Sequence, residues 1–424
     1  MNLLVESSDV LPLVDVEIAF PVGSLEDPRG REGLLQLAAH LVRRGPKGVS
    51  QARFEDELAL LGARVSVEVS MRATRFRATV LRRNLEPLIS ALSRLVWAPA
   101  LRASDFAKLK RQAEAALLSR LDDDQTLGAL HFRRALFGSH PYARPLGGTR
   151  KSLDAIVVDD VKRFYRRTLG RAPFIVGMAG DIDRNDAERL VDAYLPRSKA
   201  LPEAGASVGP TRLARGRRVV IVDKPDRAQT QLFIGTLGAR TRDPKLFALI
   251  VSNTAFGGTF SGPLMQQVRG VRGWSYGAYS RLLHSRQRDA WYMWTAPAAE
   301  YSAECASLQL DLMERWVASG ITKSELSFAK RYLVNGHCFD RDTPSKRLEA
   351  DIDVELLGVP RRYVDRHDEL VKKVTRKQAV DATRARIRPN DLTIVVVASA
   401  DQVTPAFQSL PGVRSVDVVP YDEA

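Results

Sequence analysis

The stretch that decides the fold reads Val22-Gly23-Ser24-Leu25-Glu26-Asp27-Pro28, then Gly33-Leu34-Leu35-Gln36-Leu37-Ala38-Ala39-His40-Leu41, then Gly45. It follows residues 13–20, whose alternating apolar and polar side chains predict a half-buried strand. The second part of the stretch carries apolar residues at helical spacing, and a glycine lies just past it. The sequence therefore predicts a strand, a turn at an Asp-Pro pair and a buried helix.

The same order of elements occurs a second time in the chain. Residues 229–235 predict a strand, the pair Asp243-Pro244 follows, and residues 246–256 predict a helix. Each half then continues with a long helix, a second helix and an apolar strand, predicted at 104–120, 157–167 and 174–178 and again at 323–338, 374–387 and 392–397. This repetition predicts an α+β fold with two tandem similar domains.

The boundary between the two halves is predicted from composition. Pro, Gly and Ala residues are concentrated in residues 201–210 and indicate a linker, which we place at 201–216. The chain of 424 residues is too long for one compact core. We therefore expect domains at residues 1–200 and 217–424.

Composition narrows the classes of function. The net charge of +14 is high, but the basic residues are scattered and no RNA-binding or zinc-finger signature accompanies them, so we expect no nucleic acid partner. No apolar run reaches membrane-spanning length, so we expect no membrane partner. Met1 is followed by no basic and apolar leader, which favours the cytoplasm; the periplasm stays open if a leader preceded the sequence given.

The quoted stretch resembles the M16 family of inverted-motif zinc metallopeptidases, the pitrilysin and mitochondrial processing peptidase type. In that family a helix carries His-x-x-Glu-His: residues four apart share one helical face and bind Zn²⁺, and the Glu is the general base. The corresponding residues here are Gln36, Ala39 and His40. Ala39 cannot abstract a proton, Gln36 is a poor zinc ligand, and we expect His40 to be a hydrogen-bonded helix residue.

The family's third zinc ligand is a glutamate on a later helix. The corresponding region here is Ala115-Ala116-Leu117-Leu118, with Glu114 as the nearby carboxylate. We therefore expect this degenerate metal motif to bind no catalytic zinc, the chain to bind no cofactor, and hydrolysis not to occur on the chain alone.

A second part of the resemblance lies in the other half of the chain. Phe256-Gly257-Gly258-Thr259-Phe260-Ser261-Gly262-Pro263-Leu264 is a glycine-rich loop, and Arg269 and Tyr276 follow it. The resemblance implies that Arg269 and Tyr276 bind substrate and support the transition state, and that Gly257, Gly258 and Ser261 form the supporting loop. Arg offers a planar fork of donors, and a Tyr hydroxyl can donate to a developing oxyanion. The alternative is a solvated Arg269 and a core Tyr276.

Two further motifs receive structural interpretations. Gly273-Trp274-Ser275-Tyr276-Gly277 matches the Gly-x-Ser-x-Gly elbow of serine hydrolases, but that elbow needs a strand before the Ser and a helix after it. The predicted order here is the reverse, so we do not expect Ser275 to be a nucleophile. The loop Phe137-Gly138-Ser139-His140-Pro141-Tyr142 resembles a family loop, and we expect His140 and Tyr142 to satisfy local hydrogen bonds.

The resemblance covers essentially the whole chain and implies antiparallel-rich mixed sheets packed with helices, in a half-clamshell. It implies a non-catalytic subunit of a heterodimeric zinc peptidase that grips peptide through Arg269 and Tyr276. The expected partner is a homologous subunit with an intact His-x-x-Glu-His motif and its Zn²⁺. Two alternatives stay open: a non-proteolytic structural core subunit of a larger assembly, and a peptide-binding homodimer.

Overall fold

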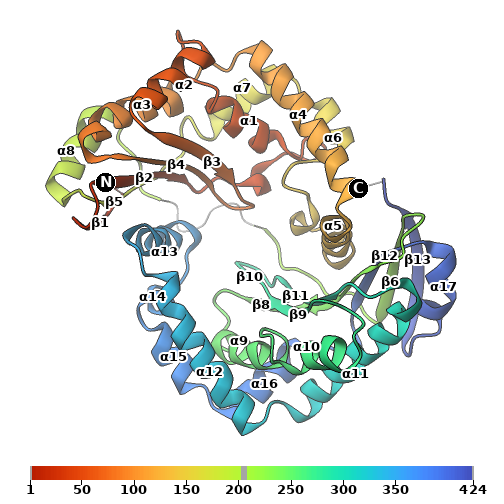
Figure 1. Cartoon of the computed structure of the whole chain (residues 1–424). Coiled ribbons are helices and arrows are strands. Elements are labelled where there is room, and N and C mark those ends of the chain that lie inside the picture. The colour runs from red at the N-terminus through yellow and green to blue at the C-terminus, as the bar shows by residue number, and fades with distance from the viewer. Residues whose placement is uncertain (1, 202–207, 423–424) are drawn as a thin grey trace. The chain divides into compact units, whose positions relative to one another are not determined.

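The computed structural model describes residues 2–201 and 208–422. The chain forms two compact units, each assembled from separate segments. Unit 1 consists of Met1–Leu117, Arg144–Ser207 and Cys338–Asp365. Unit 2 consists of Leu118–Ala143, Val208–His337 and Arg366–Ala424. The helices and strands are coloured along the chain in Figure 1.

In the described part of the chain, unit 1 has a five-stranded sheet in the order β1-β5-β2-β4-β3. Its strands are β1 Leu3–Ser7, β2 Leu13–Phe20, β3 Arg64–Val69, β4 Thr74–Leu81 and β5 Ile175–Gly180. Strands β1 and β5 are parallel, and the other neighbours are antiparallel. The sheet is therefore mixed and rich in antiparallel pairs.

Helices cover both faces of this sheet. One face packs into the main core of unit 1, and the helices of that unit are α1 Leu34–Val42, α2 Gln51–Leu60, α3 Leu85–Trp97, α4 Ala103–Asp122, α6 Arg150–Ala155, α7 Val158–Arg167, α8 Arg184–Tyr194, α13 Pro344–Leu357 and α14 Arg361–Asp365. The other face is covered by α13, whose Leu348, Ile352 and Leu356 lie one turn apart and pack on Ile175 and Ala179 (Figure 1). Burial of this apolar stripe positions α13 on the sheet.

Unit 2, within residues 118–143, 208–337 and 366–422, has a six-stranded sheet in the order β13-β6-β12-β7-β11-β9. The strands of this unit are β6 Arg217–Asp223, β7 Gln231–Leu237, β8 Ala239–Arg240, β9 Ala278–Leu282, β10 His284–Ser285, β11 Ala290–Thr295, β12 Thr393–Ala398 and β13 Val413–Pro420. The pairs β13–β6 and β6–β12 are parallel, and the pairs from β12 to β9 are antiparallel.

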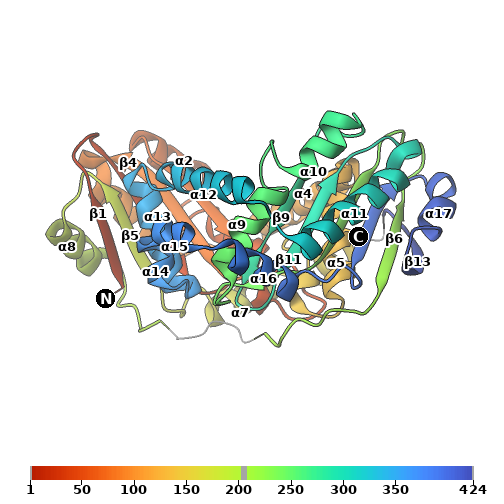
Figure 2. The same cartoon turned by 90° about the horizontal axis from the view of Figure 1, so that it is seen from below.

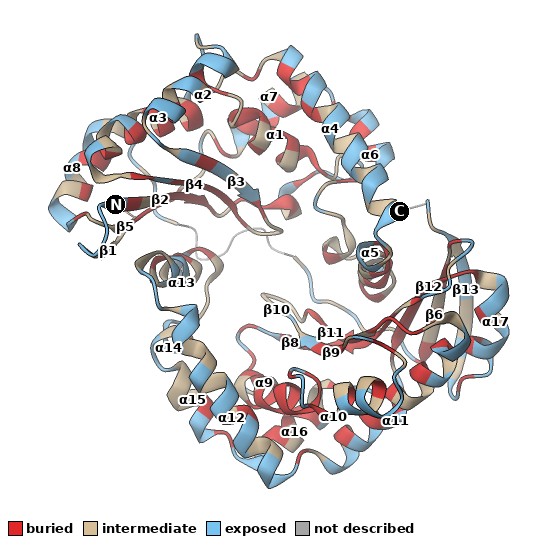
Figure 3. Cartoon of the chain, in the orientation of Figure 1, coloured by how far each residue is buried: buried red, intermediate tan, exposed pale blue. Residues whose placement is uncertain are grey.

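In unit 2, several helices pack on one another around α9, and helix α5 packs separately on the sheet. The helices of this unit are α5 Asp124–Phe137, α9 Leu246–Phe256, α10 Pro263–Met265, α11 Ser302–Ser319, α12 Lys323–His337, α15 His367–Lys373, α16 Arg376–Arg386 and α17 Ala400–Gln408. Helix α9 contacts α12, α15 and α16, and the four lie together in Figure 2. Helix α5 packs on β12, β7 and β6. Figure 3 shows strands such as β2 and β12 largely buried and the outer faces of helices such as α4 and α17 exposed.

The compact units differ from the simple division at residues 1–200 and 217–424. The segment 118–143, which contains α5, belongs to unit 2, and the segment 338–365, which contains α13, belongs to unit 1. The physical reason is burial, because each helix covers the sheet built mainly from the other half of the chain. Of the linker predicted at 201–216, residues 202–207 lie outside the described residues.

Element predictions from the repeat agree closely with the structure. The predicted strand at 13–20 is β2, and the predicted helix at 246–256 is α9. The predicted helices at 104–120 and 323–338 are α4 and α12 within one or two residues. The predicted α+β fold of two similar domains with antiparallel-rich sheets is confirmed.

Candidate functional site

Helix α1 is held at its start by a buried carboxylate. Asp27 accepts hydrogen bonds from the backbone N–H groups of Gly33 (2.9 Å) and Leu35 (2.8 Å), which lack partners in the first helical turn. Asp27 is 4% exposed, and burial raises its pKa to about 7 although both hydrogen bonds lower it. This contact fixes α1, and with it the degenerate motif, beside the strand end.

The motif residues on α1 contact one another. Gln36 Nε2 lies 2.8 Å from His40 Nε2, so the amide donates to the ring and the imidazole carries its proton on Nδ1. Burial and the charge of Arg44 lower the pKa of His40. Ala39 is fully buried, which leaves no room for a carboxylate base. The expectation that His40 is a hydrogen-bonded helix residue agrees with this contact.

The later helix that corresponds to the family's third-ligand helix is α4. Ala115 and Ala116 are exposed on it, and Glu114 is half-buried. Among the residues that the structure describes, no group of three or more His, Cys, Asp and Glu side chains with ligand atoms close together includes His40. An amide, a methyl group and a hydrogen-bonded imidazole do not fit a catalytic zinc ion.

The glycine-rich loop of unit 2 is built by close backbone contacts. Gly257 and Gly258 both donate their N–H to Asn253 O at 3.0 Å, and Gly257 O accepts from Ser280 N of β9 at 2.8 Å. A Cβ on Gly257 would lie 2.6 Å from Ser280 Oγ, and one on Gly258 would lie 2.7 Å from the Thr254 Cα. Both positions therefore require glycine, while Ser261 is exposed at the tip of the loop.

Arg269 and Tyr276 lie together directly after this loop. Arg269 belongs to a π-helical turn, η4 Gln266–Val271, and its guanidinium carbon lies 4.2 Å from the Tyr276 ring centroid and 4.9 Å from that of Phe260. The Tyr276 side chain is 82% exposed. Within the described residues, neither side chain forms a hydrogen bond or an ion pair, and Arg269 is half-buried. A core position for Tyr276, the alternative that we considered, is excluded by its exposure.

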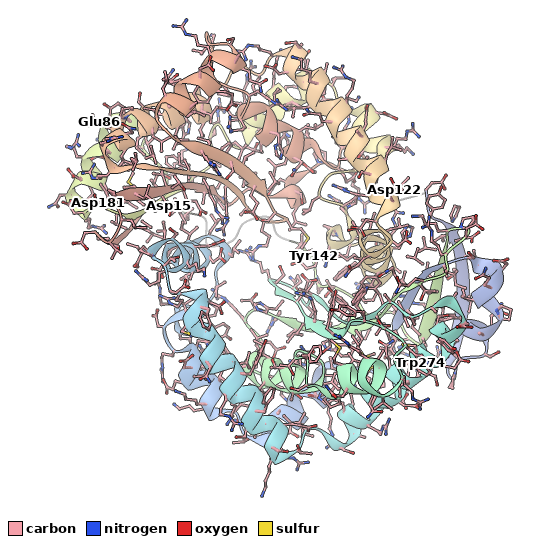
Figure 4. The ribbon with its side chains drawn as sticks, in the orientation of Figure 1. Asp15, Glu86, Asp122, Tyr142, Asp181 and Trp274 are labelled. Carbon is pink, nitrogen blue, oxygen red and sulfur yellow. The ribbon has the colours of Figure 1, made fainter. Side chains whose placement is uncertain are left out.

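A second contact between arginine and aromatic rings, which sequence reasoning missed, continues this surface. Arg272 lies 5.1 Å from the ring of Trp274, which stacks on Tyr301 with ring centroids 6.0 Å apart (Trp274 is labelled in Figure 4). Two arginines, Arg269 and Arg272, followed closely by two aromatic residues, Trp274 and Tyr276, were the available signal. Stacking of this kind holds arginine side chains in place at the protein surface.

Ser275 has a structural role. Its hydroxyl donates to Gly277 O at 2.6 Å and accepts from Ala296 N at 2.9 Å, and the side chain is buried. A helical turn precedes it and β9 follows, which is the reverse of the order a nucleophile elbow needs. The expectation that Ser275 is no nucleophile is therefore supported by its hydrogen bonds.

The loop with His140 also has a structural role. His140 Nε2 lies 2.9 Å from Gly209 O, and His140 Nδ1 accepts from Tyr142 N at 3.1 Å. Tyr142, which is labelled in Figure 4, is fully buried, and its hydroxyl lies 3.0 Å from Ser285 Oγ. These bonds occupy both nitrogens of His140, as the structural interpretation of the loop predicts.

The structure brings together one further group that the sequence did not reveal. In the part of the chain that the structure describes, His337, His367 and Asp368 form the one group of three or more metal-ligand side chains whose ligand atoms lie within 4.8 Å of one another.

Among the described residues, no helix is long and apolar enough to cross a bilayer.

Comparisons with known proteins agree with this architecture. Residues 3–150 match the model of the insulinase family, peptidase family M16, and residues 155–333 match the model of the peptidase M16 inactive domain. The chain belongs to peptidase family M16.

Individual relatives include both inactive and zinc-protease members. A non-peptidase homolog of Helicobacter pylori is 24% identical over 402 residues, covering 94% of this chain and 91% of that protein. An uncharacterised zinc protease of Streptomyces coelicolor is 27% identical over 267 residues, covering 61% of this chain and 57% of that protein. The crystal structure of a peptidase M16 inactive domain from Pseudomonas fluorescens matches with a TM-score of 0.84 at 23% identity, covering 99% of this chain and 96% of that one. The chain is thus a non-catalytic homologue within this family.

Proposed function

We propose that this chain is the non-catalytic subunit of a heterodimeric M16-type zinc peptidase. It holds the peptide substrate through Arg269 and Tyr276, while a homologous subunit with an intact His-x-x-Glu-His motif supplies the Zn²⁺ and the general base. The observation that carries the proposal is the contact between a half-buried Arg269 and an exposed Tyr276, directly after a loop whose Gly257 and Gly258 admit no larger residue.

The chemistry of the pair suits a peptide. Stacking on Tyr276 and Phe260 holds the Arg269 guanidinium by its face, which leaves its in-plane N–H groups to donate to a peptide carbonyl or carboxylate. The Tyr276 hydroxyl can donate to an oxyanion that develops when a scissile carbonyl is attacked. Both groups are donors, which matches the oxygen acceptors of a peptide bond.

Strand pairing with the substrate is assigned to the partner. The edge strand β9 has its Ser280 N–H bonded to Gly257 O, and the edge strand β3 has Val65 O bonded to Arg43 Nε at 2.8 Å. Both bonds occupy backbone groups that an added peptide strand would need. Side-chain contacts are therefore the proposed grip of this chain.

Reconstitution tests the proposal. This chain and a homologous subunit from the same organism, with an intact His-x-x-Glu-His motif, are produced separately and together, and hydrolysis of a quenched peptide library is measured. We expect a one-to-one complex by native mass spectrometry and hydrolysis by the complex alone. A homodimer that binds peptide without hydrolysing it would favour the alternative of a peptide-binding homodimer. Stable incorporation into a larger assembly without hydrolysis would favour a structural core subunit.

A further inference from the structure

Two histidines and one aspartate meet between two helices of unit 2. His337 is the last residue of α12, and His367 and Asp368 are the first two residues of α15. Oδ1 of Asp368 lies 2.9 Å from Nδ1 of His337 and 3.1 Å from Nδ1 of His367. The centroids of the two imidazole rings lie 3.9 Å apart, and the ring planes are tilted by 34°.

The charges around this group leave the aspartate without a permanent cation. The neighbouring Arg366 and Lys373 both pair with Glu369, whereas the ion-pair partners of Asp368 among the described residues are the two imidazoles. With neutral imidazoles, the group carries one negative charge and favours a cation.

We propose that His337, His367 and Asp368 bind a divalent transition-metal ion of the zinc class. Two imidazole nitrogens and one carboxylate oxygen are ligands that Zn²⁺ prefers, and three protein ligands leave the fourth tetrahedral position to water. The site is separate from the degenerate motif on α1 and departs from the expectation that the chain binds no metal.

Two of the three separations between ligand atoms are already close to the values that a tetrahedral site requires. With metal–ligand bonds of about 2.0–2.1 Å, neighbouring ligand atoms in a tetrahedral site lie roughly 3.3 Å apart. The distances from Asp368 Oδ1 to the two Nδ1 atoms are only slightly shorter. Two imidazoles on one tetrahedral ion have centroids roughly 5 Å apart, so metal binding separates the two rings by rotation of their side chains.

Packing around the group limits other movements. Lys330 Nζ of α12 donates to Lys372 O of α15 at 2.7 Å, which joins the two helices at a second point. The ring of Phe247 on α9 meets the His367 ring at 63°, with centroids 5.8 Å apart. Ligands held on packed helices lose less entropy on binding than ligands on loops.

The position of the group in the chain gives the ion a structural consequence. The chain leaves unit 2 after His337 and returns to it at Arg366, and the intervening segment contains α13. An ion bound by His337 and His367 therefore joins the end of α12, where the chain leaves unit 2, to the start of α15, where the chain returns. We expect it to slow amide hydrogen exchange at the end of α12 and the start of α15.

Zinc counting on the full-length, tag-free chain tests the site. After removal of metal with a chelator, the chain is dialysed against about 10 µM free Zn²⁺ and the bound zinc is measured by mass spectrometry. We expect one Zn²⁺ per chain, and His337→Gln and His367→Gln each to weaken binding about ten- to a hundredfold. The matched control His40→Gln, which alters the α1 motif, keeps the zinc.

A second variant distinguishes a loss of zinc binding from a loss of folding. Asp368→Asn keeps the size of the side chain and removes its charge, so it preserves the fold, monitored by circular dichroism, and weakens zinc binding. Zinc that survives both histidine substitutions, or is lost in His40→Gln alone, would overturn the proposal. So would the absence of zinc from the folded wild-type chain under these conditions.

Discussion

Gln36 Nε2 lies 2.8 Å from Nε2 of His40, so this ring nitrogen of His40 is already hydrogen-bonded. Ala39, in the position of the general base, has no solvent exposure. The motif positions on helix α1 therefore hold a hydrogen-bonded pair, Gln36 and His40, and a buried Ala39. Restoring the glutamate of the intact motif at position 39 should destabilise the fold.

Ala39→Glu tests directly whether position 39 has room for a carboxylate. A carboxylate at a fully buried position without a paired cation should lower the free energy of unfolding by about 3 kcal/mol. Gln36→His, at a half-buried position on the same helix, should change it by no more than about 1 kcal/mol. Urea unfolding measures both, and wild-type stability of Ala39→Glu would mean that space for a base remains.

Asp27 predicts a pH dependence of stability. Its folded pKa of about 7 lies above the ordinary 3.8, so the folded state binds the proton more tightly than the unfolded chain. The contribution of Asp27 is thus fully present below about pH 4 and is lost as the pH rises through about 7. Relative to Asp27→Asn, the wild type should lose on the order of 4 kcal/mol of unfolding free energy across this window.

Asp243, the Asp-Pro aspartate of the second half, is the matched control. Burial raises its pKa, but hydrogen bonds and charge from Arg386 outweigh this and hold the pKa below its ordinary value. Its stabilisation is present above the ordinary pKa and is lost as the pH falls. Asp243→Asn should therefore cost more near neutral pH than in acid, the opposite sign to Asp27→Asn. Equal pH profiles for the two variants would contradict the assignment.

Arg75 should be important for the attachment of α13. It is buried between Glu17 of β2 (3.1 Å) and Asp353 of α13. Arg75→Ala leaves two carboxylates without their main cation and should cost about 3–5 kcal/mol in urea unfolding. Arg163→Ala removes an exposed pair with Asp160 and should cost less than about 1 kcal/mol. Similar losses in both variants would refute a special role for Arg75.

The repeated elements could be predicted because their signals are local. Strand β2 and helix α9 carry alternating and helical apolar patterns, and these patterns survive in three dimensions because burial selects them. The pair Arg269 and Tyr276 could be found because a glycine-rich loop precedes it. Glycines that admit no Cβ, such as Gly257, leave a readable sequence signal.

The remaining features depend on contacts between distant segments. The stripe Leu348, Ile352 and Leu356 identifies α13 as amphipathic, but its pattern does not specify which sheet it covers. His337 and His367 are too far apart in sequence for a ligand motif, and α12 and α15 bring them together only through tertiary packing.

The central claim is tested most directly by the kinetics of the reconstituted peptidase with substitutions in the Arg269–Tyr276 pair. Arg269→Ala should raise KM about tenfold, and Tyr276→Phe should lower kcat about a hundredfold, because one loses a substrate contact and the other an oxyanion donor. Arg272→Ala, which removes the neighbouring contact to Trp274, should leave both constants near the wild type. Unchanged kcat and KM in both Arg269→Ala and Tyr276→Phe would contradict the claim that this chain holds the substrate.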